Sequence, residues 1–359
     1  MVIFIVFAGS VVLSTGAVAL MLKLSHKKAW YDHVNERKIH TGEIPRLGGI
    51  GFASVFIIVA AAVSIIFGSF EAIVYFWPCL VAMMITLVSG AFDDFKPIKA
   101  RYKLLLQFVA ALCIIIPGFI FRHLHYFDNG ILANLGWLSY PITILWIVGL
   151  TNAINLIDGV DGLAGGLSAI IAFFIGLIFF FSVETSKAVL LCASLFGVLI
   201  GFLFFNAPFP RAKIFMGDCG SQFLGLSLAL LPLVGENYGP KALPLLYAAA
   251  LFSIPIFDTT AAVWRRLRDR KHIYDPDKSH IHHKLINLGL NAKGVSLTLY
   301  SLQIVIGVLT FIAINLDGIT SLLVLGSAYL TSLAFFAAIH FLNRSIVIKG
   351  ESKMNLTPN

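Results

Sequence analysis

The stretch NAINLIDGVDGLAGGLSAIIAFFIGLIFFF, residues 152–181, contains both features that decide the fold. Its first half carries two asparagines, two aspartates and four glycines, whereas its second half is apolar and uncharged. An apolar run of about 20 residues is long enough to cross the hydrocarbon core of a bilayer as a helix. The sequence therefore predicts a transmembrane helix over 163–182 that begins at a polar, glycine-rich turn.

Similar apolar runs recur along the 359 residues, which are 58% hydrophobic and only 12% charged. A soluble domain typically carries about 25% charged residues, so a soluble fold is excluded. We expect an all-α polytopic membrane protein with about eleven transmembrane helices, and residues 1–359 as a single integral membrane domain. The expected spans are 3–22, 48–69, 71–90, 103–121, 135–151, 163–182, 187–205, 219–235, 241–264, 296–315 and 319–341.

The distribution of Lys and Arg predicts the orientation of these spans. With the N-terminus outside and the C-terminus cytoplasmic, 23 of the 26 basic residues fall on the inner side, as the positive-inside rule requires. The net charge of +8 then faces anionic lipids and metabolites, and it does not call for nucleic acid. The inner loops expected to form the active face are 23–47, 91–102, 152–162, 206–218 and 265–295.

Six aspartates lie at the expected cytoplasmic ends of spans. Carboxylates at the membrane edge are costly to keep and are usually functional. They come from four regions of the sequence but share one expected membrane depth, so we expect them to converge in a site at the inner face. They are Asp93, Asp94, Asp158, Asp161, Asp218 and Asp258.

Residues 152–166 carry the most specific of these signals. Asn152 and Asn155 are three residues apart, as are Asp158 and Asp161, so each pair can share a helical face. Gly159 and the following glycines let a ligand approach the backbone, and a helix N-terminus suits a phosphate. The alternative is a glycine-rich turn whose aspartates only cap helices.

Asp218 lies in NAPFPRAKIFMGDCGSQFLG, residues 206–225, at the expected start of a span. The basic residues upstream and Phe215 resemble the wall of an anion pocket, although Asp218 as a simple cap is the alternative. Asp93-Asp94 precedes a run of four basic residues, which is typical of a solvated helix end or of metal and phosphate binding. Asp and Asn oxygens are hard ligands suited to Mg²⁺.

Two further signals lie near the C-terminal end of the ninth span. Pro255 is expected to break or kink this span, and Asp258 is expected either to pair with Arg265 or Arg266 or to bind substrate. His280, His282 and His283 follow in a His-x-His-His cluster. No further ligands are spaced for zinc, so with Arg265 upstream we interpret these histidines as phosphate contacts.

From RKIHTGEIPRLGGIG (37–51) through Asp93-Asp94, NAINLIDGVDGLAG and FMGDCGS to SHIHHKL, the chain resembles the polyprenyl-phosphate N-acetylhexosamine-1-phosphate transferases. It is most similar to those that transfer N-acetylglucosamine-1-phosphate to undecaprenyl phosphate. The resemblance covers nearly the whole chain. It implies a multi-pass enzyme of the bacterial inner membrane that takes UDP-N-acetylglucosamine, releases UMP and begins a cell-envelope glycan pathway, with teichoic acid and O-antigen both open. A homodimer is left open too.

The resemblance also implies roles for the site residues. Asp218, helped by Asn155, would hold Mg²⁺, for which Mn²⁺ is the alternative ion, and Asp94 with Asp93 would position or deprotonate the lipid phosphate. Asp158 and Asp161 would shape the nucleotide and sugar site. The expected substrate contacts are Asn152, Gly159, Phe215, Arg265, His280, His282 and His283.

Two alternative functions are consistent with parts of the sequence. A sister group transfers phospho-MurNAc-pentapeptide to the same lipid and carries three consecutive histidines, where this chain has Ile281 within HIHH. A transporter would place its charges near the membrane midplane, often in paired repeats. The acids here lie at one face and no repeat is visible, which favours the enzyme.

The interrupted histidine run predicts the choice of sugar donor. Purified protein with undecaprenyl phosphate and Mg²⁺ should release UMP from UDP-N-acetylglucosamine and almost none from UDP-MurNAc-pentapeptide. A preference for the pentapeptide donor would move the chain to the sister group.

Overall fold

The computed structural model of the chain describes residues 1–31, 44–68, 70–126, 130–181, 186–207, 211–236, 243–272, 277 and 279–354. The predicted inner loops 23–47, 206–218 and 265–295 therefore lie partly outside the described residues. Each residue that we expect at the site is among the described residues.

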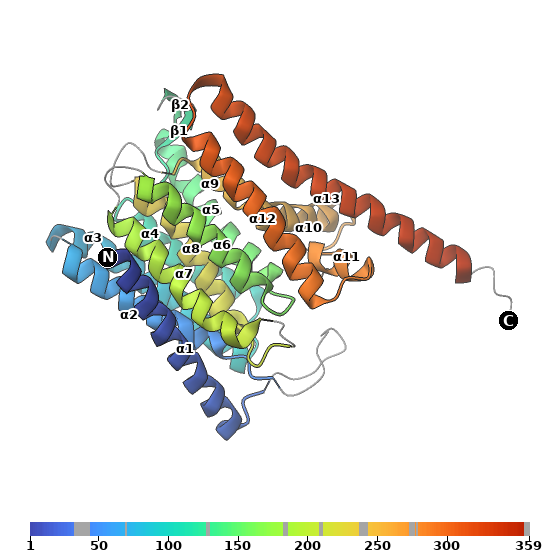
Figure 1. Ribbon diagram of the computed structural model, residues 1–359, viewed down its shortest axis with the longest axis horizontal. Helices are drawn as coiled ribbons and strands as arrows, with labels where there is room; N and C mark the ends of the chain where they lie inside the picture. The colour runs from blue at the N-terminus through green and yellow to red at the C-terminus, as the bar shows by residue number, and fades with distance from the viewer. Residues whose placement is uncertain are drawn as a thin grey trace.

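Helices make up nearly all of the described chain (Figure 1). They are α1 (Val2–Lys28), α2 (Gly48–Phe67), α3 (Phe70–Phe95), α4 (Ala100–Ile115), α5 (Ser139–Ile157), α6 (Leu163–Phe181), α7 (Ser186–Asn206), α8 (Gly217–Glu236), α9 (Leu245–Leu251), α10 (Ser253–Arg268), α11 (Ile281–Asn287), α12 (Ala292–Ile314) and α13 (Gly318–Met354). The described strands, β1 (His123–Tyr126) and β2 (Gly130–Asn134), form one antiparallel hairpin in the segment between α4 and α5, and the 3-10 turn η1 (Gly136–Leu138) follows it.

Among the described helices, nine are long and apolar enough to cross a membrane, and the bent pair α9 and α10 is a candidate tenth. Helix α4 has 16 residues, or about 24 Å at 1.5 Å per residue, which is shorter than the hydrocarbon core of about 30 Å. It ends just before Pro117 and Gly118, where a φ of 100° at Gly118 turns the chain. The all-α polytopic membrane fold is confirmed, while the count of eleven and the orientation remain predictions.

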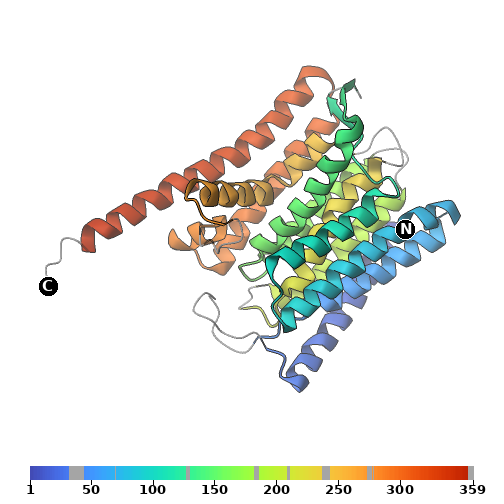
Figure 2. The same ribbon diagram turned by 180° about the vertical axis from the view of Figure 1, so that it is seen from behind.

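The break expected in the ninth span, 241–264, is present, but it lies before Pro255 and not at it. Helix α9 ends at Leu251 and α10 begins at Ser253, with an angle of 82° between them. Pro255 lies in the first turn of α10, where its missing N–H group costs no helical hydrogen bond. The proline thus sits just after the break, and α10 runs across the direction of the neighbouring bundle helices (Figure 2).

Helix α8 is the most buried of the nine candidate spans. Phe223 on α8 packs edge-on against Phe52 and Phe56 of α2, and the Trp146 indole on α5 donates a hydrogen bond of 3.0 Å to the Ala229 carbonyl. An apolar helix enclosed on all sides belongs to the interior of a bundle. The residues at the N-terminal end of α8 are therefore held in place by several other helices.

Helices α1 and α13 have the least buried apolar windows of the nine candidate spans. Helix α13 has 37 residues, or about 55 Å at 1.5 Å per residue, and its C-terminal end projects well past the bundle (Figure 1). The expected eleventh span ended at residue 341, so the helix continues beyond it to Met354.

The predicted orientation can be tested with single cysteines on exposed described residues. Asn287→Cys, at the end of α11, should react with a membrane-impermeant thiol reagent only after the inner face is opened. Asp317→Cys, between α12 and α13, should react in intact cells. The parent chain is the control, because three of its cysteines are buried and Cys113 is partly buried. Reversed labelling would overturn the orientation.

Candidate functional site

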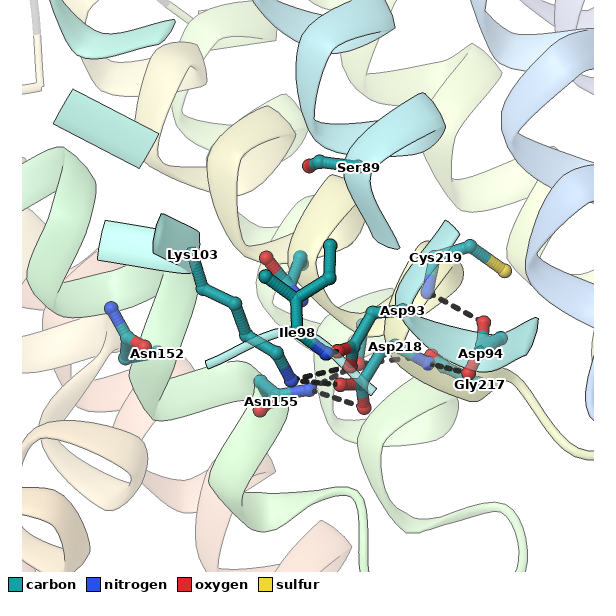
Figure 3. Close-up of polar contacts among 12 residues, drawn as sticks. Ser89, Asp93, Asp94, Ile98, Lys103, Asn152, Asn155, Gly217, Asp218 and Cys219 are labelled. Atoms are coloured by element: carbon teal, nitrogen blue, oxygen red, sulfur yellow. Dashed lines mark hydrogen bonds and ion pairs between the residues drawn. The ribbon is translucent and has the colours of Figure 1, made fainter. Parts of the chain in front are cut away.

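Asp94, near the end of α3, fixes the beginning of α8. Its two carboxylate oxygens accept hydrogen bonds from the backbone N–H groups of Asp218 and Cys219, at 2.9 and 3.0 Å (Figure 3). The first N–H groups of a helix have no partner within the helix, and a negative charge there is favourable. The Asp94 side chain is only 1% exposed. It therefore caps α8 from inside the bundle.

The segment before α2 pairs with the segment before α8. The N–H groups of Gly48 and Gly49 donate to the carbonyls of Phe215 and Met216 at 3.0 and 2.9 Å, and the Phe215 N–H donates to the Pro45 carbonyl at 2.7 Å. Two motifs about 170 residues apart, PRLGG and FMGDCGS, thus lie side by side. Phe215 is partly buried and serves this pairing through its backbone.

This pairing requires glycine at two positions. A Cβ atom on Gly49 would lie 2.3 Å from the Cα atom of Gly220, a separation that no side chain tolerates. Gly217 has a φ of 73°, and a Cβ there would lie 2.2 Å from the Arg46 carbonyl oxygen. The backbone at the beginning of α8 therefore packs directly against the backbone before α2, with no space for a side chain at either glycine.

Asp218, in the first turn of α8, lies at the centre of a charged cluster (Figure 3). The Lys103 ammonium on α4 is 2.8 Å from one carboxylate oxygen of Asp218, and it also pairs with Asp93. The Asn155 amide on α5 donates to the other Asp218 oxygen at 3.2 Å. Arg46 lies 3.7 Å from Asp94. Two cations thus face three carboxylates.

This cluster brings together four of the predicted residues, Asp93, Asp94, Asn155 and Asp218. Within the described part of the chain, no three His, Cys, Asp or Glu side chains are grouped so that they could hold a metal ion by themselves. The Asn155 amide nitrogen, not its oxygen, faces Asp218, so a ligand role for Asn155 requires the amide to turn over.

Asn152 lies deeper in the bundle, in a layer of neutral amides beneath the charged cluster. Its amide donates to Gln107 on α4 at 2.7 Å, and Gln107 donates to Gln222 on α8 at 3.1 Å. Gln107 follows Lys103 by four residues and Gln222 follows Asp218 by four, so each pair lies on one helical face. Helices α4, α5 and α8 are therefore joined twice, once through Asp218 and once through the layer of amides.

Asp158 and Asp161 follow α5 and differ in their surroundings. Asp161 accepts a hydrogen bond of 2.9 Å from the Ala212 N–H group and so holds the segment between α7 and α8. The Asp158 carboxylate makes no hydrogen bond or ion pair with any described residue. Burial, together with the neighbouring carboxylates, raises the pKa of Asp158 to about 7.

Asp258 pairs with a histidine and not with an arginine. One of its oxygens lies 2.8 Å from His280 Nδ1, and the other accepts the Ile281 N–H group at 2.8 Å, which caps α11. Arg265, the expected partner, instead pairs with Asp277 at 2.6 Å. The expected pair of Asp258 with Arg265 or Arg266 is therefore absent, because the chain brings the beginning of α11 to Asp258. The alternative role of Asp258 in substrate binding stays a prediction.

His282, on α11, contacts the segment that follows α5. Its ring packs against Gly159 so closely that a Cβ there would lie 2.4 Å from His282 Nε2. The residue is 2% exposed, and burial lowers its pKa to about 3, so the imidazole is neutral. His280 stacks beside it and His283 lies next to it. The predicted phosphate contacts of these histidines and of Arg265 remain predictions.

Lys103, Gln107 and Gln222 were not among the site residues predicted from the sequence. One signal was available, since a lysine and a glutamine four residues apart mark a polar stripe on an otherwise apolar helix. Asp218 and Gln222 repeat this spacing on α8. Matching stripes on two helices indicate that the helices face each other.

Comparison with known proteins places this arrangement in a family. Residues 76–236 match the family described as glycosyl transferase family 4. A Bacillus subtilis (strain 168) protein named as a probable undecaprenyl-phosphate N-acetylglucosaminyl 1-phosphate transferase is 37% identical over 286 residues, covering 78% of this chain and 76% of the relative. An Escherichia coli (strain K12) undecaprenyl-phosphate alpha-N-acetylglucosaminyl 1-phosphate transferase is 31% identical over 280 residues, covering 76% and 73%. The chain therefore belongs to glycosyl transferase family 4, together with these undecaprenyl-phosphate N-acetylglucosaminyl 1-phosphate transferases.

Proposed function

We propose that this chain transfers N-acetylglucosamine-1-phosphate from UDP-N-acetylglucosamine to undecaprenyl phosphate and releases UMP. The reaction would take place at the cytoplasmic face of the bacterial inner membrane, as the first membrane step of a cell-envelope glycan. The names of the relatives support the substrates. The observation that carries the proposal is the convergence of Asp93, Asp94 and Asp218 with Lys103 at one end of the buried helix α8.

The donor set fits Mg²⁺, with Mn²⁺ as the alternative ion. Asp93 and Asp218 direct carboxylate oxygens at one cation, the Lys103 ammonium, and the Asp218 side chain is 24% exposed, so ligands can reach it. Mg²⁺ commonly takes one or two protein carboxylates and fills its remaining positions with water and substrate phosphates. Bound Mg²⁺ would neutralise charge on the diphosphate oxygens during transfer.

The reaction would join the lipid phosphate oxygen to the β-phosphorus of the UDP-sugar and break the bond from this phosphorus to the oxygen of UMP. A phosphate monoester has a second pKa near 6, so the nucleophile is largely ionised at pH 7. A strong general base is therefore unnecessary, and positioning dominates the rate. Asp94 is 1% exposed with both oxygens in hydrogen bonds. This geometry favours Asp94 as the support of Asp218 over Asp94 as a base.

Two further predicted residues extend the proposed site. Asp158 and Gly159, beside His282, would form the nucleotide and sugar side of the site. The two basic side chains of the charged cluster, Lys103 and Arg46, would face the phosphates of both anionic substrates. The interrupted HIHH run favours UDP-N-acetylglucosamine over the pentapeptide donor of the sister group.

The metal role is tested by Asp218→Asn. The substitution keeps the size of the side chain but removes the charge that would offset Mg²⁺, an interaction worth several kcal/mol in the transition state. We expect turnover, measured as UMP release, to fall by about a thousandfold, because each 1.36 kcal/mol changes a rate tenfold.

Asp317→Asn is the matched control. It removes the same charge at an exposed position between α12 and α13 and should leave turnover within about twofold of the parent. Near-normal turnover with unchanged Mg²⁺ dependence in Asp218→Asn would place the metal elsewhere. Absence of UMP from the parent protein with both substrates and Mg²⁺ would refute the proposed reaction itself.

A further inference from the structure

Lys103 occupies an unexpected place in the charged cluster. It lies in the first turn of α4, and that turn contains no acidic residue. The N-terminal end of a helix carries a partial positive charge and disfavours a lysine. The side chain is nonetheless held inward, between Asp93 and Asp218, and is 28% exposed. Contacts with these two carboxylates, and not helix stability, account for its position.

A lysine ammonium and a divalent cation both bind to carboxylate oxygens, so they can compete for Asp93 and Asp218. The Lys103 nitrogen is 2.8 Å from one oxygen of Asp218 and pairs with one oxygen of Asp93. Asp93 and Asp218 would hold Mg²⁺ through the same oxygens that now contact the ammonium. The ion and the ammonium would therefore compete for these oxygens, and their like charges would repel each other.

We propose that Lys103 fills the cation position between Asp93 and Asp218 in the substrate-free protein, so that the divalent ion binds there only when Lys103 leaves. This inference rests on the proposed function for the presence of the ion. The flexible four-carbon stem allows the ammonium to move, and the partly exposed side chain has room to do so. Once displaced, Lys103 becomes an unpaired cation beside the site and attracts the phosphates of the substrates. Lys103 is thus a positioning residue that couples binding of the ion to binding of the anions.

The competition is measured without substrates, as the affinity of the purified protein for Mn²⁺ by electron paramagnetic resonance. Lys103→Met removes the competing ammonium but keeps a side chain of similar length, so Mn²⁺ should bind about tenfold more tightly or better. Lys99→Met is the matched control. Lys99 precedes α4, is exposed and carries the same charge, so its loss should change the affinity by less than about twofold.

Equal or weaker Mn²⁺ binding by Lys103→Met would overturn the inference. Equal tightening by both variants would overturn it too, because the effect would then be general electrostatic attraction. If the parent releases UMP with Mg²⁺ while Lys103→Met binds Mn²⁺ no more tightly, the inference fails and the proposed function stands.

A second measurement uses the unaltered protein and so does not depend on the folding of a variant. A limiting amount of an amine-acylating reagent is added with and without saturating Mn²⁺, and acylation at Lys103 and Lys99 is read by mass spectrometry. Displacement from the two carboxylates should raise acylation of Lys103 several-fold and leave Lys99 unchanged. Unchanged or reduced acylation of Lys103 would contradict the proposal.

Discussion

The rest of the site depends on how the buried beginning of α8 is held. A helix N-terminus inside a bundle leaves N–H groups that water cannot satisfy, and Asp94 supplies acceptors for two of them. The space around this end is so limited that Gly90 on α3 lies against the backbone of Cys219, where a Cβ would come within 2.5 Å. The backbone of Asp218 is fixed by this arrangement, because its N–H group donates to Asp94 and Gly217 before it is enclosed by Arg46 and Asp94. The segment before α2, the end of α3, the beginning of α4 and the end of α5 therefore all meet the beginning of α8.

Holding three carboxylates near one another is costly. Two like charges 4 Å apart repel by about 4 kcal/mol at an effective dielectric constant of 20. The chain offsets this repulsion with the backbone N–H groups on Asp94 and with Lys103 between Asp93 and Asp218. A cluster that needs a cation for its own stability is suited to accept one during the reaction. The stability of the fold and the chemistry of the site thus rest on the same contacts.

The sequence predicted the membrane fold well, because long apolar runs carry strong, local signals. Of the six aspartates expected to converge, Asp93, Asp94 and Asp218 meet in one cluster, whereas Asp258 is paired with His280. The sequence did not predict which side chains contact each other across the bundle. Asp258 was expected either to pair with an arginine near it in the sequence or to bind substrate, and the return of the chain at the beginning of α11 gives it His280 as its partner. The layer formed by Gln107, Asn152 and Gln222 was missed, because a single amide within an apolar run does not reveal which helix it faces.

Asp94→Asn tests most directly whether the cap on α8 governs the site. Asparagine keeps one oxygen acceptor, but its NH₂ group would face one of the two backbone N–H groups that Asp94 now accepts, those of Asp218 and Cys219. Two donors facing each other repel, so the position of Asp218 should shift. We expect turnover, measured as UMP release, to fall by the same factor at pH 6 and at pH 8, and Mn²⁺ to bind more weakly. A base that deprotonates the lipid phosphate would matter only where this phosphate, with a pKa near 6, is still protonated. A loss at pH 6 that disappears at pH 8, with unchanged Mn²⁺ affinity, would show that Asp94 acts as a base and not as the cap that holds Asp218.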